Sequence, residues 1–347
     1  MPLLDIQDLH LEFGTGADAV RAVDGLSLTI AEGETLGLVG ESGCGKSVTA
    51  LSITRLVPAP PARYTSGRIL LDGKDVLKME QSKLRHIRGK MVSYIFQEPG
   101  SSLNPVFRVG SQIKESLQLH RPEMATDSEV IRLLKLVGIP APELRIKDYP
   151  HQMSGGMQQR IMIAMALASE PRLLVADEPT TALDVTIQAQ ILDLLRDLKQ
   201  RLRMSILLIT HNLGIVGDIA DRVAVMYAGK ILEDAEVRAI FHHPRHPYVR
   251  RLIGAIPRVG GSRFRLDGID GAAPSPLAWP AGCRFHPRCA DALPECSTIM
   301  PLLVVTGAPD GQQLTRSMVA CHLHPAEAIA TDVSGLEVAA PSQKEDR

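Results

Sequence analysis

The stretch Gly40-Glu41-Ser42-Gly43-Cys44-Gly45-Lys46-Ser47 contains a glycine, four further residues, and then glycine, lysine and serine, the pattern of a phosphate-binding loop. Residues 35–39 predict a buried strand, and residues 47–56 predict the start of a helix. Glycines let backbone N–H groups point inward at phosphate oxygens, while the helix N-terminus and Lys46 add positive charge. Ser47 is the expected Mg²⁺ ligand, and Val48 is assigned to the same site. The sequence therefore predicts nucleoside triphosphate binding.

Composition restricts the class of protein. The chain has 347 residues, enough for two domains, and 45% of them are hydrophobic. A formal net charge of −1 and only 3% aromatic residues argue against a nucleic-acid partner. No apolar run approaches the roughly 18 residues of a membrane span, and residues 1–5 lack the features of a signal peptide. We therefore expect a cytosolic protein that docks onto a membrane protein.

The pattern along the chain predicts an α/β fold. Two alternating stretches, residues 3–13 and 20–30, predict an antiparallel β subdomain, and residues 67–73 predict a hairpin. A more polar, helical region predicts an inserted helical subdomain at about 103–170. Strands alternating with helices elsewhere predict a largely parallel sheet. We expect a nucleotide-binding domain at 1–241, a small cysteine-containing module at 242–325 and a disordered tail at 326–347.

A second nucleotide element lies in Leu173-Leu174-Val175-Ala176-Asp177-Glu178. An apolar strand ends here in two carboxylates, which would lie at the carboxyl edge of the sheet beside the phosphate-binding loop. Asp177 suits the coordination shell of Mg²⁺, and Glu178 suits polarisation of the attacking water. Without the upstream loop, such a pair would indicate a solvated turn.

The segment Met153-Ser154-Gly155-Gly156-Met157-Gln158-Gln159-Arg160 resembles the signature motif of ATP-binding cassette (ABC) ATPases, which usually have leucine at the position of Met153. Ser154 and the two glycines lie at a predicted helix N-terminus, where hydroxyl and N–H groups can bind a γ-phosphate. An isolated tripeptide of this kind would be a plain helix cap. Its place about 20 residues before the strand carboxylates favours the family motif.

Further residues match motifs of the same family in order. Gln97 resembles the glutamine that contacts Mg²⁺ and senses the transporter, residues 182–184 resemble the D-loop at the dimer interface, and His211 resembles the switch histidine. Phe13 is the choice for the aromatic that stacks on adenine. The resemblance implies ATP with Mg²⁺ bound at Ser47, Gln97 and Asp177, and catalysis by Glu178, His211, Lys46 and Gln97. The implied nucleotide contacts are Phe13, Gly40, Glu41, Ser42, Gly43, Cys44, Gly45, Lys46, Ser47, Val48, Gln97, Ser154, Gly155, Gly156, Asp177 and Asp184.

Two other features resemble the oligopeptide, dipeptide and nickel importers of this family. Residues 96–105 resemble their Q-loop segment, and residues 245–248 with 255–257 also resemble this group. The cysteine-containing run from Cys283 to His322 resembles their C-terminal extension. Cys283, Cys289, Cys296 and Cys321 have the spacing that in this group is associated with an iron–sulfur cluster, here a 4Fe–4S cluster. A tetrahedral zinc site that recruits His286 or His322 is the alternative. Four unliganded cysteines are the third interpretation.

The resemblance implies an ATPase subunit that powers uptake of di- or oligopeptides. Its expected partners are two membrane permeases, a second ABC ATPase and an extracytoplasmic solute-binding protein. The helical insert would receive a coupling helix, and the chain would lie peripherally on the cytoplasmic side of the inner membrane. Nickel or another small solute is an alternative cargo. A soluble, non-transport ABC ATPase and a nucleotide kinase are the alternatives from other classes.

Overall fold

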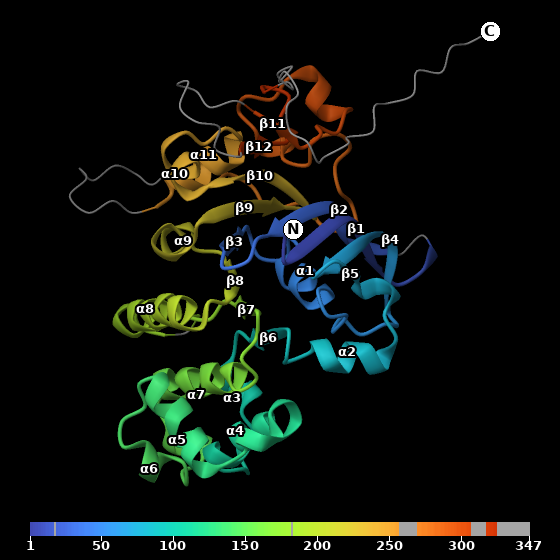
Figure 1. Cartoon of the computed structure of the whole chain (residues 1–347). Coiled ribbons are helices and arrows are strands. Elements are labelled where there is room, and N and C mark those ends of the chain that lie inside the picture. The colour runs from blue at the N-terminus through green and yellow to red at the C-terminus, as the bar shows by residue number, and fades with distance from the viewer. Residues whose placement is uncertain (17–18, 182, 257–268, 307–316, 325–347) are drawn as a thin grey trace.

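The computed structural model describes residues 1–16, 19–181, 183–256, 269–306 and 317–324 (Figure 1). These residues form two β-sheets with associated helices and a separate group of helices. The predicted tail at 326–347 lies outside them. The predicted mixture of antiparallel and parallel strands is confirmed, and the strands and helices that frame the phosphate-binding loop lie where the sequence predicts them.

The N-terminal sheet is antiparallel, with the strand order β2-β1-β4-β5. Its strands are β1 (Leu4–Phe13), β2 (Val20–Ile30), β4 (Ala62–Leu71) and β5 (Lys74–Asp75). Leu4 lies opposite both Ile30 and Leu71, so apolar side chains of three strands share one face. Asp72 and Gly73 have positive φ angles and form the tight turn of the predicted hairpin. Alternation of apolar and polar residues thus produces a sheet with one buried face.

The second sheet has eight strands in the order β11-β12-β10-β9-β3-β8-β7-β6. The five strands β6, β7, β8, β3 and β9 pair in parallel, whereas β10, β12 and β11 add antiparallel edges. Apolar runs form the parallel part because both of its faces are buried, one mainly against the N-terminal sheet and the other against helices. The strand bounds are β3 Thr35–Val39, β6 Val92–Ile95, β7 Leu173–Asp177, β8 Ser205–Thr210, β9 Arg222–Tyr227, β10 Lys230–Glu236, β11 Val304–Val305 and β12 Ser317–Val319.

The helices fall into groups with different positions (Figure 1). The first helix, α1 (Lys46–Ser52), is shorter than the sequence predicts and ends in a turn that includes Arg55 at positive φ. Two long helices pack against the parallel strands. They are α7 (Gly155–Leu167) and α8 (Val185–Leu202). The other helices are α2 Gln81–Ile87, α3 Pro99–Ser102, α4 Val109–His120, α5 Asp127–Leu136, α6 Pro142–Arg145, α9 Leu213–Ile219, α10 Val237–His242 and α11 Pro247–Gly254.

The helical insert forms a layer of its own. Helices α3 to α7 gather at one end of the molecule, away from the antiparallel sheet (Figure 1). Short 3-10 turns at Pro122–Met124 and Pro150–Gln152 separate its helices, because proline ends one helix and begins the next. None of the helices in the described ranges has both the length and the apolar character that a bilayer span requires.

The C-terminal residues pack against the large sheet. Strand β12 pairs with β10. Of two 3-10 turns nearby, His286–Arg288 is followed directly by Cys289, and Pro294–Ser297 contains Cys296. Phe285 lies in a buried aromatic group with Tyr227 and Tyr248, at ring distances of 5.5 and 5.2 Å. These residues share one core with β9 and β10. The domain boundary at residue 241 stays a prediction.

A candidate nucleotide-binding site at the ends of the parallel strands

The phosphate-binding loop connects β3 to α1, as predicted. Gly43 and Gly45 adopt φ angles of 77° and 109°, which side chains with a Cβ rarely adopt. A Cβ at Gly40 would lie 2.1 Å from the backbone oxygen of Met226, and one at Gly45 would lie 2.5 Å from the oxygen of Ala22. The glycines are therefore required both for the turn and for close packing against neighbouring backbone.

The Lys46 ammonium lies inside this loop. Nζ donates to the carbonyl oxygens of Gly40 and Glu41 at 2.7 and 2.9 Å, and Cys44 Sγ lies 3.8 Å away. Only 6% of Lys46 is exposed, so its aliphatic stem is buried and its charge is fixed close to the loop backbone. A cation surrounded by backbone dipoles in this way is suited to bind a phosphate.

Asp177 ends β7, and its carboxyl lies close enough to the Ser47 hydroxyl for that hydroxyl to affect its pKa. Burial raises the pKa of Asp177, although the Ser47 hydroxyl lowers it in part. Its Oδ1 atom is buried without a hydrogen-bond partner. A carboxylate oxygen with no partner, next to a serine hydroxyl, is a suitable pair of ligands for Mg²⁺, which prefers oxygen. The residues present therefore fit the predicted metal.

Glu178 lies at the centre of a hydrogen-bond group. Its Oε2 accepts from Gln97 Nε2 at 3.1 Å and from the Thr181 hydroxyl at 2.8 Å, while Oε1 lies 3.0 Å from His211 Nδ1. The structure thus brings together three residues that the sequence predicts as catalytic. Sequence reasoning missed Thr181, whose position three residues after the carboxylate, in the same turn, was the available signal.

The environment of Glu178 favours its charged form. Burial raises the pKa of this carboxyl, but hydrogen bonds from His211 and Thr181 outweigh burial and lower it below the ordinary value. Glu178 also has a positive φ of 46°, and its N–H donates to the Ile209 carbonyl at 2.8 Å. Non-glycine residues with this backbone conformation are concentrated at functional sites. Glu178 is consequently an ionised acceptor, fixed at the strand end.

Ser154 and Asp184 begin neighbouring helices. The Ser154 hydroxyl accepts from Met157 N at the start of α7, and Asp184 accepts from Ile187 N at the start of α8. A Cβ at Gly156 would lie 2.8 Å from Ile187, so the two helix starts pack together. Within one chain, α7 lies apart from α1 and the phosphate-binding loop (Figure 1). The structure therefore places the predicted signature residues next to the part of the predicted D-loop that contains Asp184. Ala182, which also belongs to the predicted D-loop, lies outside the described residues.

Phe13 and Val48 lie at the edge of the N-terminal core. Phe13 ends β1, and both side chains are half-buried against this core. Ser42 and Ser47 are exposed, whereas Cys44 is buried and its thiol has a pKa raised by that burial. Adenine stacking by Phe13 stays a prediction.

Two residues that no motif assigned to the nucleotide site contact the phosphate-binding loop. Arg288 Nη1 donates to both carboxylate oxygens of Glu41, at 3.0 and 2.9 Å. The hydroxyl of Tyr248 accepts a hydrogen bond from the Glu41 N–H at 3.2 Å. Both partners are more than 200 positions away from Glu41 in the sequence, so no local pattern could identify them.

The predictions of an iron–sulfur cluster and of a zinc site are not supported. In the described ranges, which include all four C-terminal cysteines, no three His, Cys, Asp or Glu side chains are arranged to bind a metal ion. Burial is the largest cause that raises the pKa of the thiols of Cys283, Cys289 and Cys321, the last to about 11, and the charges of neighbouring cysteines raise it further.

The two histidines considered for zinc have other partners. His286 Nδ1 lies 2.9 Å from the Cys283 carbonyl oxygen, and His322 Nε2 lies 2.9 Å from the Ile299 carbonyl oxygen. Cys283 and Cys296 are buried among apolar residues and are joined by a backbone hydrogen bond of 2.8 Å. Cys289 packs against the same core.

Comparisons with known proteins agree with the geometry. Residues 23–181 match the family described as ABC transporter, and residues 232–296 match the oligopeptide/dipeptide transporter C-terminal region. The chain is 49% identical over 301 residues to the dipeptide transport ATP-binding protein DppD of Bacillus subtilis, covering 86% of this chain and 90% of that one. It is 47% identical over 304 residues to the oligopeptide transport ATP-binding protein AppD of the same organism, covering 87% and 93%.

A solved structure shows the same fold. The dimeric, post-hydrolysis ATP-binding cassette MJ0796, bound to ADP and Pi, superposes with a TM-score of 0.60 at 25% identity. The match covers 68% of this chain and 99% of that chain.

Proposed function

Because this chain belongs to the ABC transporter family and carries the C-terminal region of its oligopeptide/dipeptide transporters, we propose that it is the ATP-binding subunit of a dipeptide or oligopeptide importer. It is an ATPase whose hydrolysis is coupled to transport. The observation that carries the proposal is the convergence of Gln97, Thr181 and His211 on the Glu178 carboxylate, in a chain that also has a complete phosphate-binding loop.

Each residue of the site has a role in this proposal. Lys46 and the N–H groups of the loop bind the β- and γ-phosphates. Ser47, Asp177 and Gln97 would bind Mg²⁺, which neutralises phosphate charge when it is present. Glu178 orients and polarises the attacking water. His211 lies against the same carboxylate, where it can contact the terminal phosphate and the water together.

A second cassette completes the site in this proposal. Ser154, Gly155 and Gly156 lie at the start of α7, apart from the phosphate-binding loop of the same chain. A γ-phosphate would therefore contact the signature residues of a partner subunit, with Asp184 at the interface between the two. The dimeric form of MJ0796 supports the pairing of two cassettes. Hydrolysis would remove the shared contacts and separate the subunits.

The helical layer supports a permease partner. Val106 and Phe107 follow the Q-loop and are 72% and 56% exposed, unusual for large apolar side chains. We assign this surface to the coupling helix of a membrane permease. The complex would then contain two permeases, this chain, a second ATPase and a solute-binding protein, with this chain bound peripherally at the cytoplasmic face.

Uptake measurements test the proposal directly. Cells that lack this chain are complemented with the wild type, with Ser154→Ala, or with Glu115→Gln, which changes an exposed residue of α4. Labelled dipeptide, labelled tetrapeptide and radioactive nickel are supplied separately. We expect the wild type and Glu115→Gln to restore peptide uptake, and Ser154→Ala not to. Nickel uptake without peptide uptake would favour the alternative cargo. If the wild type restores the uptake of neither peptide nor nickel, the proposed transport function is wrong.

A further inference from the structure

An ion pair connects the phosphate-binding loop to the C-terminal segment 247 positions later. Arg288 Nη1 lies 3.0 and 2.9 Å from the two carboxylate oxygens of Glu41. The Arg288 side chain is only 9% exposed and that of Glu41 is 26% exposed. Because water is largely excluded from the guanidinium, this pair differs from exposed ion pairs, which contribute little.

Every N–H group of Arg288 has a protein acceptor. Nη1 also donates to the Tyr227 hydroxyl at 3.2 Å, while Nε and Nη2 donate to backbone carbonyl oxygens. These carbonyls belong to Asp270 at 2.9 Å, Ile269 at 3.4 Å and Gly271 at 3.0 Å. A guanidinium has five N–H donors, so none is left for a phosphate oxygen. Arg288 therefore acts on the nucleotide only through Glu41 and its own neighbours.

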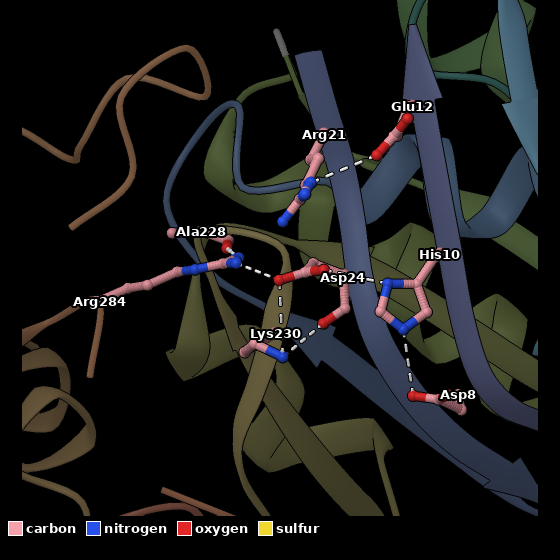
Figure 2. Close-up of polar contacts among 8 residues, drawn as sticks. All are labelled: Asp8, His10, Glu12, Arg21, Asp24, Ala228, Lys230 and Arg284. Atoms are coloured by element: carbon pink, nitrogen blue, oxygen red, sulfur yellow. Dashed lines mark hydrogen bonds and ion pairs between the residues drawn. The ribbon is translucent and has the colours of Figure 1, made fainter. Parts of the chain in front are cut away.

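A second arginine of the same segment contacts the strand next to the loop. Figure 2 shows the Arg284 guanidinium donating to the Asp24 carboxylate and to the Ala228 carbonyl. Lys230 Nζ also donates to the Asp24 carbonyl oxygen, at 2.6 Å. The Arg284 guanidinium lies 3.5 Å from the centre of the Trp279 ring. The turn between β9 and β10 is thus fixed from the C-terminal side.

This turn contacts the phosphate-binding loop by backbone hydrogen bonds. The N–H of Gly229 donates to the Cys44 carbonyl at 2.9 Å, and the N–H of Asp24 donates to the Gly229 carbonyl at 3.1 Å. Tyr248 adds a further contact, because its hydroxyl accepts the Glu41 N–H at 3.2 Å. The loop is consequently attached at Glu41 and at Cys44, on either side of the exposed residues Ser42 and Gly43.

From these contacts we propose that residues 283–288 position the phosphate-binding loop for nucleotide, with Arg288 as the positioning residue and Glu41 as the contact through which it acts. The inference rests on the proposed function, since the ligand is ATP. A glycine-rich loop has many accessible conformations, and binding is weakened by the cost of ordering it. An ion pair that keeps Glu41 in place reduces that cost before ATP arrives.

The test compares four variants of the full chain, Arg288→Met, Arg288→Lys, Glu41→Gln and the double variant Arg288→Met/Glu41→Gln. Arg250→Met is the matched control, because Arg250 forms a half-exposed pair with Asp291 at 3.0 Å in the same region. The dissociation constant of a fluorescent ATP analogue, and KM and kcat for ATP hydrolysis, are measured for each. Thermal unfolding measures whether each variant is folded.

We expect Arg288→Met and Glu41→Gln each to raise the dissociation constant and KM about tenfold, equivalent to about 1.4 kcal/mol. We expect kcat to change little, since loop positioning affects ground state and transition state alike. The double variant should resemble either single variant, Arg288→Lys should recover part of the affinity, and Arg250→Met should match the wild type.

Additive effects of the two substitutions would overturn the inference, because uncoupled residues give additive free energies. A lower kcat at constant KM, with a smaller folded fraction, would also overturn it and assign Arg288 a purely structural role. Glu41→Gln changes the loop and leaves the C-terminal packing intact, so it tests the coupling even if Arg288→Met unfolds. A wild type that binds no ATP analogue would instead contradict the proposed function.

Discussion

Replacing Glu178 by glutamine removes one negative charge while preserving the shape of the site. The amide oxygen can still accept from Gln97 and Thr181, which now contact Oε2 at 3.1 and 2.8 Å. The amide NH₂ can then donate to His211 Nδ1, because the imidazole can adopt the tautomer in which Nδ1 is an acceptor. In the wild type, Glu178 Oε1 lies 3.0 Å from this nitrogen. All three contacts are thereby retained in Glu178→Gln.

The expected magnitude follows from this geometry. With its contacts retained, the variant should lose only about 1 kcal/mol of stability, the scale of one altered hydrogen bond. The amide cannot accept a proton from water, and general-base catalysis contributes about 10²- to 10⁴-fold. At 1.36 kcal/mol for each factor of ten, the activation barrier rises by about 3–5 kcal/mol. ATP hydrolysis should therefore fall much further than stability or ATP binding.

Phosphate release, ATP binding and thermal unfolding are measured on the purified wild type, Glu178→Gln and the control Glu115→Gln. Glu115 is exposed on α4 and should behave as wild type in all three measurements. The reasoning is refuted if Glu178→Gln hydrolyses ATP within a factor of about ten of the wild type, below the range expected for a lost general base. Loss of ATP binding together with hydrolysis would also refute it, because the substitution would then have disturbed the phosphate-binding loop.

Other substitutions give separate tests. In Gly40→Ala the new Cβ would lie 2.1 Å from the backbone oxygen of Met226, so ATP binding should be lost. Gly100→Ala is the control, because a Cβ there meets open space, and this variant should bind ATP as the wild type does. Equal ATP affinities of the two variants in a fluorescence titration would contradict the prediction. Ser154→Ala removes a helix cap whose hydrogen bond is 3.4 Å long, so it should cost about 1 kcal/mol of unfolding free energy or less but abolish most ATPase activity of the assembled pair. Burial raises the pKa of Glu233 from 4.5 to about 7, so this group contributes stability below pH 4.5 that is lost as pH rises through 7. Between pH 4.5 and pH 8 the wild type should lose about 3 kcal/mol of unfolding free energy relative to Glu233→Gln, as measured by denaturant unfolding. A difference in unfolding free energy between the two proteins that stays constant with pH would contradict a raised pKa of Glu233.

Local patterns predicted most of the residues that the fold brings together at the candidate site. The loop from Gly40 to Ser47 lies between a strand and a helix, as its glycine spacing requires, and Asp177 and Glu178 end a buried strand. Ordered motifs also identified Gln97 and His211, which the fold brings onto one carboxylate. These residues lie together because parallel strands end at one edge of a sheet, so residues after successive strands become neighbours. Thr181 escaped only because a threonine in a turn has no specific pattern.

Spacing alone does not decide whether the four C-terminal cysteines bind a metal. Four thiols at characteristic intervals predicted a metal centre, yet whether thiols ligate depends on their directions and on burial, which spacing does not specify. In the structure Cys283 and Cys296 pack among apolar side chains, and the nearby His286 contacts a backbone carbonyl. Burial, with the charge of the neighbouring Cys296, raises the pKa of Cys283 and Cys289.

The amino-acid sequence by itself determined the loop that surrounds phosphate, the carboxylates beside it and the family, because each depends on residues close together in the chain. Only the tertiary structure decided that Arg288 pairs with Glu41, that Tyr248 contacts the same residue and that β12 extends the sheet of the cassette. Contacts over such separations arise when apolar surfaces such as those of Tyr227 and Phe285 pack together. The hydrophobic effect that drives this packing is non-directional. It therefore produces no sequence pattern that predicts which distant residues pair.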